Sequence, residues 1–178
     1  MDIQEFFQLS AGKWFSQRTS HRLDFPQIDS SKSDIIIEII PTDSISVVKI
    51  CQQHNVAPTL AWGGVQVTWD STTEQDKIKR TSSTVVVPIA DLDNPNQGKL
   101  LQETSNGKTP DAGRYAIGSD DTLTLITEND RMYSEERISF ASNNLRLRTS
   151  VVKQLGNFST TSFWTEIRMG VVQPPAQT

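Results

Sequence analysis

The residues with the clearest potential for chemistry lie in a short alternating segment, 145–150 (LRLRTS). In an extended strand, alternate side chains point to opposite faces, so Arg146, Arg148 and Ser150 would share one face. A guanidinium binds a carboxylate through two parallel hydrogen bonds and stays charged at physiological pH. The pattern therefore fits two structures. The arginines either face water above a leucine core, or line a cavity and bind the carboxylates of a ligand.

A carboxylate on the preceding strand could complete such a site. In segment 132–138 (MYSEERI), Ser134, Glu136 and Ile138 share one face, and the turn segment 142–144 (SNN) joins this strand to the arginine strand. Beside two arginines, Glu136 would belong either to a surface ion-pair ladder, worth about 0–1 kcal/mol, or to a cavity. In a cavity it could bind N–H groups or deliver a proton.

Aromatic and basic side chains on other strands are further candidates. Trp69 shares a face with Val65 and Val67, which suits either core packing or the wall of a site for a flat aromatic ligand. Arg18 and His21 lie on opposite faces of one strand, unless a β-bulge near Thr19 realigns them. His21 could equally be a structural histidine.

Nucleophilic and metal-dependent chemistry receive little support. Cys51 precedes His54 by three residues on a predicted helix, but no third orienting group or oxyanion-hole element lies near them in the sequence. Cys51 is therefore expected to be a buried, inert thiol. A single cysteine excludes an intramolecular disulfide framework and a multi-cysteine zinc site. His21 and His54 lie too far apart to form an HExxH pair on one helix turn, so no metal is expected.

Two helices and ten strands are expected to position these residues. Ile3, Phe6, Phe7 and Ser10 form one stripe of a short N-terminal helix, and Ser44–His54 forms a second helix between the second and third strands. The strands are predicted at Lys13–His21, Asp34–Ile40, Gly64–Asp70, Thr81–Pro88, Gly98–Thr104, Gly113–Ile117, Thr122–Thr127, Met132–Ala141, Leu145–Val152 and Thr160–Met169.

This pattern favours an all-β fold: a ten-stranded antiparallel up-and-down barrel. Closure removes the sheet edges, and the succession of short turns favours a barrel over the alternative two-sheet sandwich. Trp14, in a Gly-x-Trp motif after the first helix, would plug one end, as in calycin-type barrels. The expected organisation is a single domain over residues 1–170 and a flexible tail over 171–178.

Composition narrows the class of protein. The chain has 178 residues and a net charge of −4, which argues against a general nucleic-acid binder and a polybasic membrane-surface protein. No apolar stretch approaches the length of a membrane span, and no signal-peptide pattern opens the chain. A soluble cytosolic protein without nucleic-acid or membrane partners is therefore expected.

Longer segments resemble a known family, the S/U clan of phycobiliprotein bilin lyases. These are calycin-fold chromophore lyases of cyanobacteria and related plastids, similar to lipocalin and fatty-acid-binding barrels. The resemblance runs nearly end to end, through residues 2–21, 63–70, 123–128, 132–141, 144–150 and 162–170. It implies an enzyme that holds an open-chain tetrapyrrole, phycocyanobilin or phycoerythrobilin, as substrate without a prosthetic group. The enzyme joins this bilin by a thioether to a cysteine of an apo-phycobiliprotein subunit.

The resemblance also implies roles for the candidate residues. Arg146 and Arg148 would pair with the two bilin propionates, with Arg18 as a further cation. Glu136 would contact the pyrrole nitrogens and favour the protonated bilin. Trp69 would wall the pocket, and Ser150 and His21 would hydrogen-bond at its rim.

The resemblance also implies an acceptor protein, an oligomeric state and a location in the cell. The acceptor would be a subunit of phycocyanin, allophycocyanin or phycoerythrin. The lyase would be a homodimer, or a heterodimer with a related subunit, in the cyanobacterial cytosol or plastid stroma. The alternative is a non-catalytic carrier barrel for bilin or fatty acid, or one lyase subunit that is inactive alone. A phycobilisome linker is disfavoured by the acidic charge.

Overall fold

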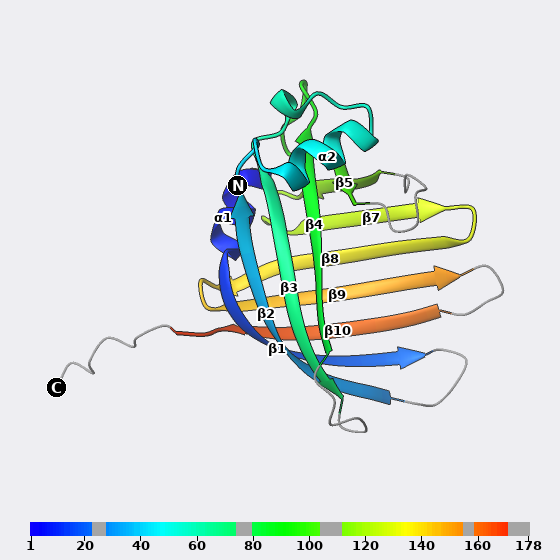
Figure 1. Cartoon of the computed structure of the whole chain (residues 1–178). Coiled ribbons are helices and arrows are strands. Elements are labelled where there is room, and N and C mark those ends of the chain that lie inside the picture. The colour runs from blue at the N-terminus through cyan, green and yellow to red at the C-terminus, as the bar shows by residue number, and fades with distance from the viewer. Residues whose placement is uncertain (23–27, 74–79, 104–111, 155–158, 171–178) are drawn as a thin grey trace.

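Ten antiparallel strands form one closed barrel (Figure 1). This computed structural model describes residues 1–22, 28–73, 80–103, 112–154 and 159–170, with only the backbone at 71–73 and 80. Each strand pairs with its neighbours in the chain, and β1 closes the barrel by pairing with β10. The predicted up-and-down barrel is therefore confirmed, and the two-sheet sandwich is wrong.

The elements follow the predicted order. The helices are α1 (Ile3–Ser10), α2 (Ile45–Gln53) and the short 3₁₀ helix η1 (Pro58–Leu60). The strands are β1 (Gly12–Arg22), β2 (Ile28–Ile40), β3 (Gly64–Thr73), β4 (Arg80–Ala90), β5 (Gln97–Gln102), β6 (Gly113–Ile117), β7 (Leu123–Asn129), β8 (Met132–Ser142), β9 (Leu145–Gln154) and β10 (Ser159–Arg168).

The largest difference from the expected boundaries is at β2, which begins at Ile28 and not at Asp34. Segment 29–33 (DSSKS) has no apolar alternation to mark a strand, yet its backbone pairs in register with β1. The pairing is imposed by barrel closure and not by side-chain pattern. The predicted end of the fifth strand, Thr104, and the predicted tail, 171–178, lie outside the described residues.

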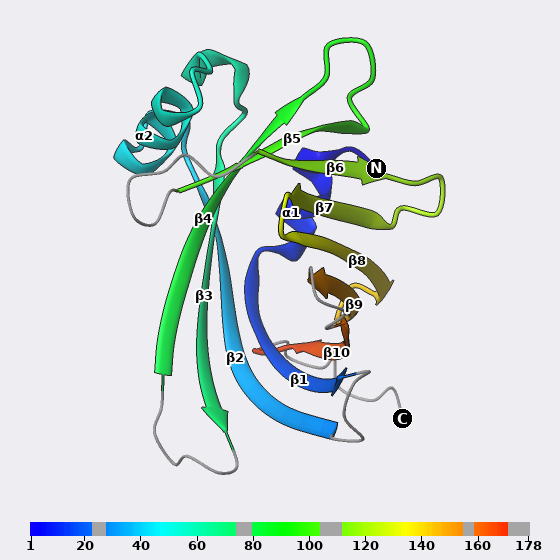
Figure 2. The same ribbon diagram turned by 90° about the vertical axis from the view of Figure 1, so that its right-hand side faces the viewer.

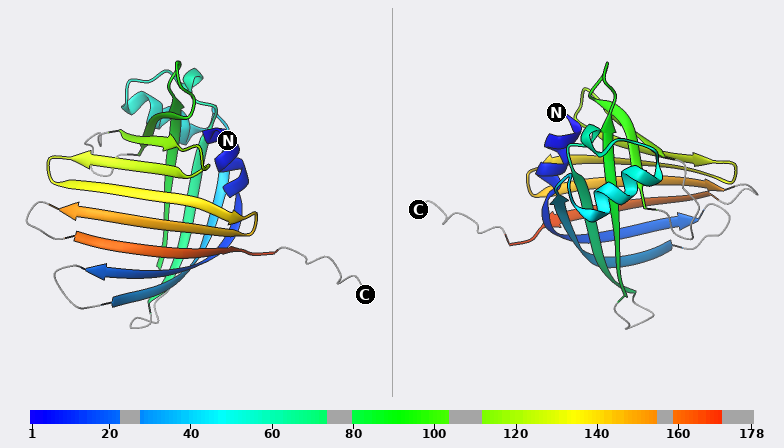
Figure 3. Two further views of the ribbon diagram at one scale, coloured as in Figure 1. Left: turned by 180° about the vertical axis from the view of Figure 1, so that it is seen from behind. Right: turned by 45° about the horizontal axis from the view of Figure 1, so that its top comes forward.

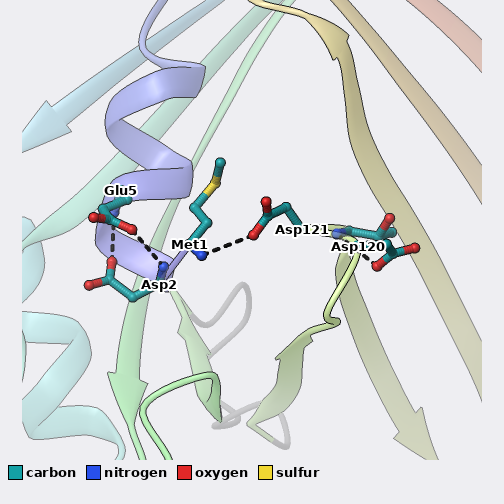
Figure 4. A network of polar contacts seen from close by, with 6 residues as sticks. Met1, Asp2, Glu5, Asp120 and Asp121 are labelled. Atoms are coloured by element: carbon teal, nitrogen blue, oxygen red, sulfur yellow. Dashed lines mark hydrogen bonds and ion pairs between the residues drawn. The ribbon is translucent and has the colours of Figure 1, made fainter.

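Helix α1 lies at the end of the barrel where β1 begins (Figure 1). Asp2 and Glu5 form a capping box at its start, and its buried residues Ile3, Phe6 and Phe7 join the core inside the barrel. The amino group of Met1 forms an ion pair with Asp121 in the turn between β6 and β7, at 2.9 Å (Figure 4). The helix therefore covers one end of the barrel.

Helix α2 packs on the outside of the barrel (Figure 3). Ser44 caps its start, and Val47, Ile50 and Cys51 are fully buried against Val87 and Leu101 of β4 and β5. The neighbouring side chains of these two strands, Val86 and Leu100, belong to the inner core. This part of the wall is therefore buried on both faces, whereas no helix among the described residues covers the outer faces of β7–β10 and β1 (Figure 2).

None of the helices in the described ranges is long and apolar enough to cross a membrane.

Candidate functional site

The strand register shows which side chains point into the barrel. Trp14 belongs to the inner core, so the even-numbered residues of β1 face inward, and register carries this face across β10, β9 and β8. Three successive rows of inward side chains result. They are Ser16–Glu166–Arg146–Phe140, then Arg18–Trp164–Arg148–Ile138, then Ser20–Ser162–Ser150–Glu136. The arginines of β9 therefore face the interior, and the leucines of β9 face outward.

The opposite wall of the interior is apolar. Its buried side chains come from β2–β7 and include Ile35, Ile37, Val65, Val86, Leu100, Tyr115, Ile117 and Leu123, with Val67, Trp69 and Leu125 partly buried beside them. The interior thus has a polar wall made by β8, β9, β10 and β1, and an apolar wall made by the remaining strands. A ligand that suits it has charged groups along one edge and a large apolar surface along the other.

The first of two ion pairs in the polar wall joins Arg148 and Glu136. Arg148 Nη2 donates to Glu136 Oε1 at 2.6 Å, and the guanidinium carbon lies 4.7 Å from the ring centroid of Trp164. The two side chains are diagonal neighbours on β9 and β8. They are 27% and 24% exposed, so solvent reaches both of them.

The second ion pair lies deeper, one row nearer α1. Arg146 Nε donates to Glu166 Oε2 at 2.5 Å, and the two side chains are only 6% and 0% exposed. Burial lowers the pKa of the Arg146 guanidinium, and the neighbouring Glu166 carboxylate opposes that shift. The guanidinium carbon also lies 4.9 Å from the ring centroid of Trp14. This pair forms the floor of the polar wall.

Beneath that floor, Trp14 plugs the barrel as predicted. It is fully buried, and its Nε1–H donates to the carbonyl of Ser10 in α1 at 2.8 Å. The Arg168 guanidinium carbon lies 4.2 Å from the Trp14 ring centroid. Arg168 also donates to the carbonyls of Leu9 and Ala11 at the C-terminal end of α1. A cation at that end offsets the partial negative charge of the helix, so Arg168 fastens the covering helix.

The sequence-predicted residues are brought together with one exception. Glu136, Arg146, Arg148, Ser150 and Arg18 share the polar wall, and Trp69 lies on the facing apolar wall.

The exception is His21, which is exposed on the outer face of β1. The described pairs of β1 run without a register shift through Thr19, so the bulge that would bring His21 beside Arg18 is not there. Strand alternation therefore keeps the two side chains on opposite faces.

Two residues of the interior were not singled out from the sequence. Glu166, the partner of Arg146, is fully buried, and Arg168 fastens α1. In the alternating segment Ser162–Arg168, both residues lie on the same face of the strand as Trp164. The signal was the presence of charged residues on the face of a strand that also carries a tryptophan.

Cys51 lies in the outer cluster under α2, away from the interior, and burial raises the pKa of its thiol. Its expected character as a buried thiol agrees with this position.

The fold and this interior define a class: a closed ten-stranded barrel whose covered interior has paired arginines and glutamates on one side and apolar side chains on the other. Residues 2–169 match the family described as CpeS-like protein. The chain belongs to that family.

Named relatives agree along almost the whole chain. A chromophore lyase CpcS/CpeS from Thermosynechococcus vestitus is 53% identical over 98% of this chain and 96% of its own. A phycocyanobilin lyase subunit CpcS from a Picosynechococcus species is 44% identical over 94% of this chain and 86% of its own. The solved S-type phycobiliprotein lyase CPES from Guillardia theta has a TM-score of 0.87 and 32% identity, covering 97% of this chain and 95% of its own.

These findings confirm the family resemblance, the barrel fold and the expectation of an enzyme of the bilin-lyase class.

Proposed function

We propose that this chain holds an open-chain tetrapyrrole inside its barrel and joins it to a cysteine of an apo-phycobiliprotein subunit. The observation that carries the proposal is the division of the interior into a polar wall with paired arginines and an apolar wall. A bilin has the same division, because two propionates project from one edge of a flat, largely apolar chain of four rings. The bilin is the substrate, and the proposal includes no prosthetic group.

The propionates would bind along the row Arg18–Trp164–Arg148. Trp164 on β10 stands directly between Arg18 on β1 and Arg148 on β9. Adjacent strands lie about 4.8 Å apart, so the two arginines flank a span of about 10 Å, which suits two carboxylates on neighbouring rings. Arg18 Nε is buried and lacks a hydrogen-bond partner among the described residues, so its N–H can donate to a ligand carboxylate. Arg146 lies one row deeper and would reinforce the positive potential.

Glu136 would act on the ring nitrogens. It already bears a charge-assisted hydrogen bond from Arg148 and is partly exposed to the interior, so it can face a pyrrole N–H. A carboxylate in that position favours the protonated, more electrophilic bilin. Trp69 would pack against the rings, and Ser150, next to Glu136 in the third row, would hydrogen-bond near the rim.

The reaction itself is an addition. The acceptor thiol forms a new carbon–sulfur bond at the ethylidene group of ring A, the carbon–carbon double bond of that group is lost, and a proton is delivered to the ring carbon. No oxidant or reductant is consumed. The thiol belongs to the acceptor protein, so the lyase needs no nucleophilic cysteine of its own, in agreement with the buried position of Cys51 outside the interior.

We propose phycocyanobilin as the first bilin to test, because the 44% identical relative is named for it, whereas a putative phycoerythrobilin lyase from Microchaete diplosiphon is 32% identical. The acceptor would be a phycocyanin, allophycocyanin or phycoerythrin subunit. The lyase would work in the cyanobacterial cytosol or plastid stroma, as a homodimer or with a related subunit.

The second candidate function is a carrier that binds bilin without transferring it. One relative is named a lyase subunit, which is consistent with a chain that transfers bilin only together with a second subunit. A two-stage experiment separates the candidates. Purified protein is titrated with phycocyanobilin and, in a parallel series, with phycoerythrobilin, and binding is followed by absorption. Apo-phycocyanin is then added, and the products are run on an acid–urea gel. A red-shifted spectrum followed by colour that stays on phycocyanin supports the lyase. Colour that stays non-covalently on this protein supports the carrier, and no spectral change with either bilin refutes both.

A further inference from the structure

Glu166 is the most deeply buried charged side chain in the interior, and the proposed reaction assigns it nothing. It is 0% exposed, and its Oε2 accepts from Arg146 Nε at 2.5 Å. Its other oxygen, Oε1, has no hydrogen-bond partner among the described residues. Ser16, directly opposite on β1, is 1% exposed and its Oγ likewise lacks a partner there. These two unpaired oxygens therefore lie on directly paired residues of β1 and β10.

A contribution to stability does not by itself explain a buried ion pair such as Arg146–Glu166. Removing two charges from water costs several kcal/mol, and apolar side chains of similar volume often stabilise a fold equally well. A buried charge pair that faces a ligand site can instead fix the geometry of one of its members. Arg146 is the member whose position matters here, because it lies directly below Arg148 on the same face of β9.

Arg146 is held from two sides. Glu166 orients the Nε edge of its guanidinium, and Trp14 lies beneath the guanidinium carbon at 4.9 Å. Trp14 is itself fixed by its hydrogen bond to Ser10 and by Arg168 at 4.2 Å. Trp14 is thus anchored to the covering helix, and Glu166 is the remaining contact that determines where the Arg146 charge points.

We propose that Glu166 is a positioning residue for bilin binding. It acts through Arg146, by holding that guanidinium under the Arg18–Trp164–Arg148 row, where its charge favours the propionates. Glu166 need not touch the bilin. This inference rests on the proposed function, and it adds a residue to which the sequence assigned no role.

A double-mutant cycle tests the proposal. The dissociation constant of phycocyanobilin and the transfer rate are measured for wild type, Glu166→Gln, Arg146→Gln and the double variant. Glu166→Gln is expected to weaken binding about tenfold, the effect of misplacing one charged hydrogen-bonding group, and to raise KM with kcat little changed. The same change should have no further effect once Arg146 is already glutamine, because Glu166 acts only through Arg146.

Two controls separate positioning from loss of stability. Glu135→Gln makes the same chemical change on the outer face of β8 and should leave binding unchanged. Glu166→Asp keeps the charge with a shorter side chain, and it should recover part of the affinity. It also replaces Glu166→Gln if that variant does not fold. Melting temperatures are recorded for every protein.

The outcomes are distinct. If wild type binds the bilin and Glu166→Gln binds it equally well, or if the two single effects add in the double variant, Glu166 does not position Arg146 and the inference is wrong. The proposed function survives that result. If wild type itself binds neither phycocyanobilin nor phycoerythrobilin, the proposed function is wrong and the inference falls with it.

Discussion

Removing Arg148 is expected to weaken bilin binding strongly while the protein stays folded. Arg148→Ala deletes the 2.6 Å hydrogen bond to Glu136 and the contact with Trp164 at 4.7 Å. Both side chains of the ion pair are about one quarter exposed, so solvent screens them and the pair contributes about 1 kcal/mol. The cation–π contact adds about 0.5–1 kcal/mol.

The stability loss is therefore about 1.5–2 kcal/mol, which lowers the melting temperature of a chain of this size by about 3–8 °C. The binding loss is of equal or greater size, because a hydrogen bond between a guanidinium and a ligand carboxylate contributes about 1.5–3 kcal/mol. That corresponds to a dissociation constant raised about 10- to 150-fold.

The assay pairs an absorption titration with phycocyanobilin and a thermal melt on the same protein. Arg137→Ala is the matched control, since Arg137 is exposed on the outer face of β8, one strand away. Arg137→Ala should leave the dissociation constant unchanged. If folded Arg148→Ala binds bilin within threefold of wild type, Arg148 does not hold a propionate and the orientation of the ligand along the polar wall is wrong.

Three further variants test other parts of the structure. Cys51→Ser should keep full transfer activity on the acid–urea gel. It should lose about 1–3 kcal/mol of stability, because it places a hydroxyl in the apolar cluster under α2. Loss of transfer in a folded variant would restore a covalent role for Cys51. Arg168→Ala should lower the free energy of unfolding by about 2–4 kcal/mol, because the carbonyls of Leu9 and Ala11 lose their donor, and unchanged denaturant curves would contradict that role. Burial raises the pKa of Tyr115 to about 12, so its contribution to stability is fully present below about pH 10 and is lost as the pH rises from 10 to 12. Tyr115→Phe should therefore remove this decline from the free energy of unfolding measured against pH. The same decline in both proteins would refute the assignment.

The barrel was predictable because its information is local. Apolar alternation and turn residues marked each strand from β6 to β10 to within one or two positions. The start of β2 carries no such local pattern. Residues 29–33 are polar on both faces, and they join the sheet because β1 and β3 offer backbone partners on either side. A partner from a distant part of the chain leaves no pattern in the segment that it recruits.

The inward face of β9 was not decidable from β9 alone. Leucines and arginines alternate there, and both possible orientations satisfy the period of two. The usual burial preference favours leucine inside, yet Leu145 and Leu147 are half-buried on the outer face and Arg146 is buried inside. What fixes the orientation is the register with β10, whose inward face carries Glu166 as a counter-charge. A buried arginine is stable only with such a partner.

The sequence predicted one carboxylate, Glu136, beside both Arg146 and Arg148, whereas the fold provides two. Glu136 was the nearest carboxylate in sequence, because a tight turn brings β8 beside β9. The barrel supplies a second carboxylate from the other neighbour of β9, and the two arginines divide between the two strands: Arg148 bonds to Glu136, and Arg146 bonds to Glu166. This division leaves each pair with a different exposure, since one lies in the accessible row and the other on the floor. The two arginines are therefore equivalent in the sequence and different in the fold, and a direct contact with a ligand carboxylate suits Arg148, whereas a buried charge acting from below suits Arg146.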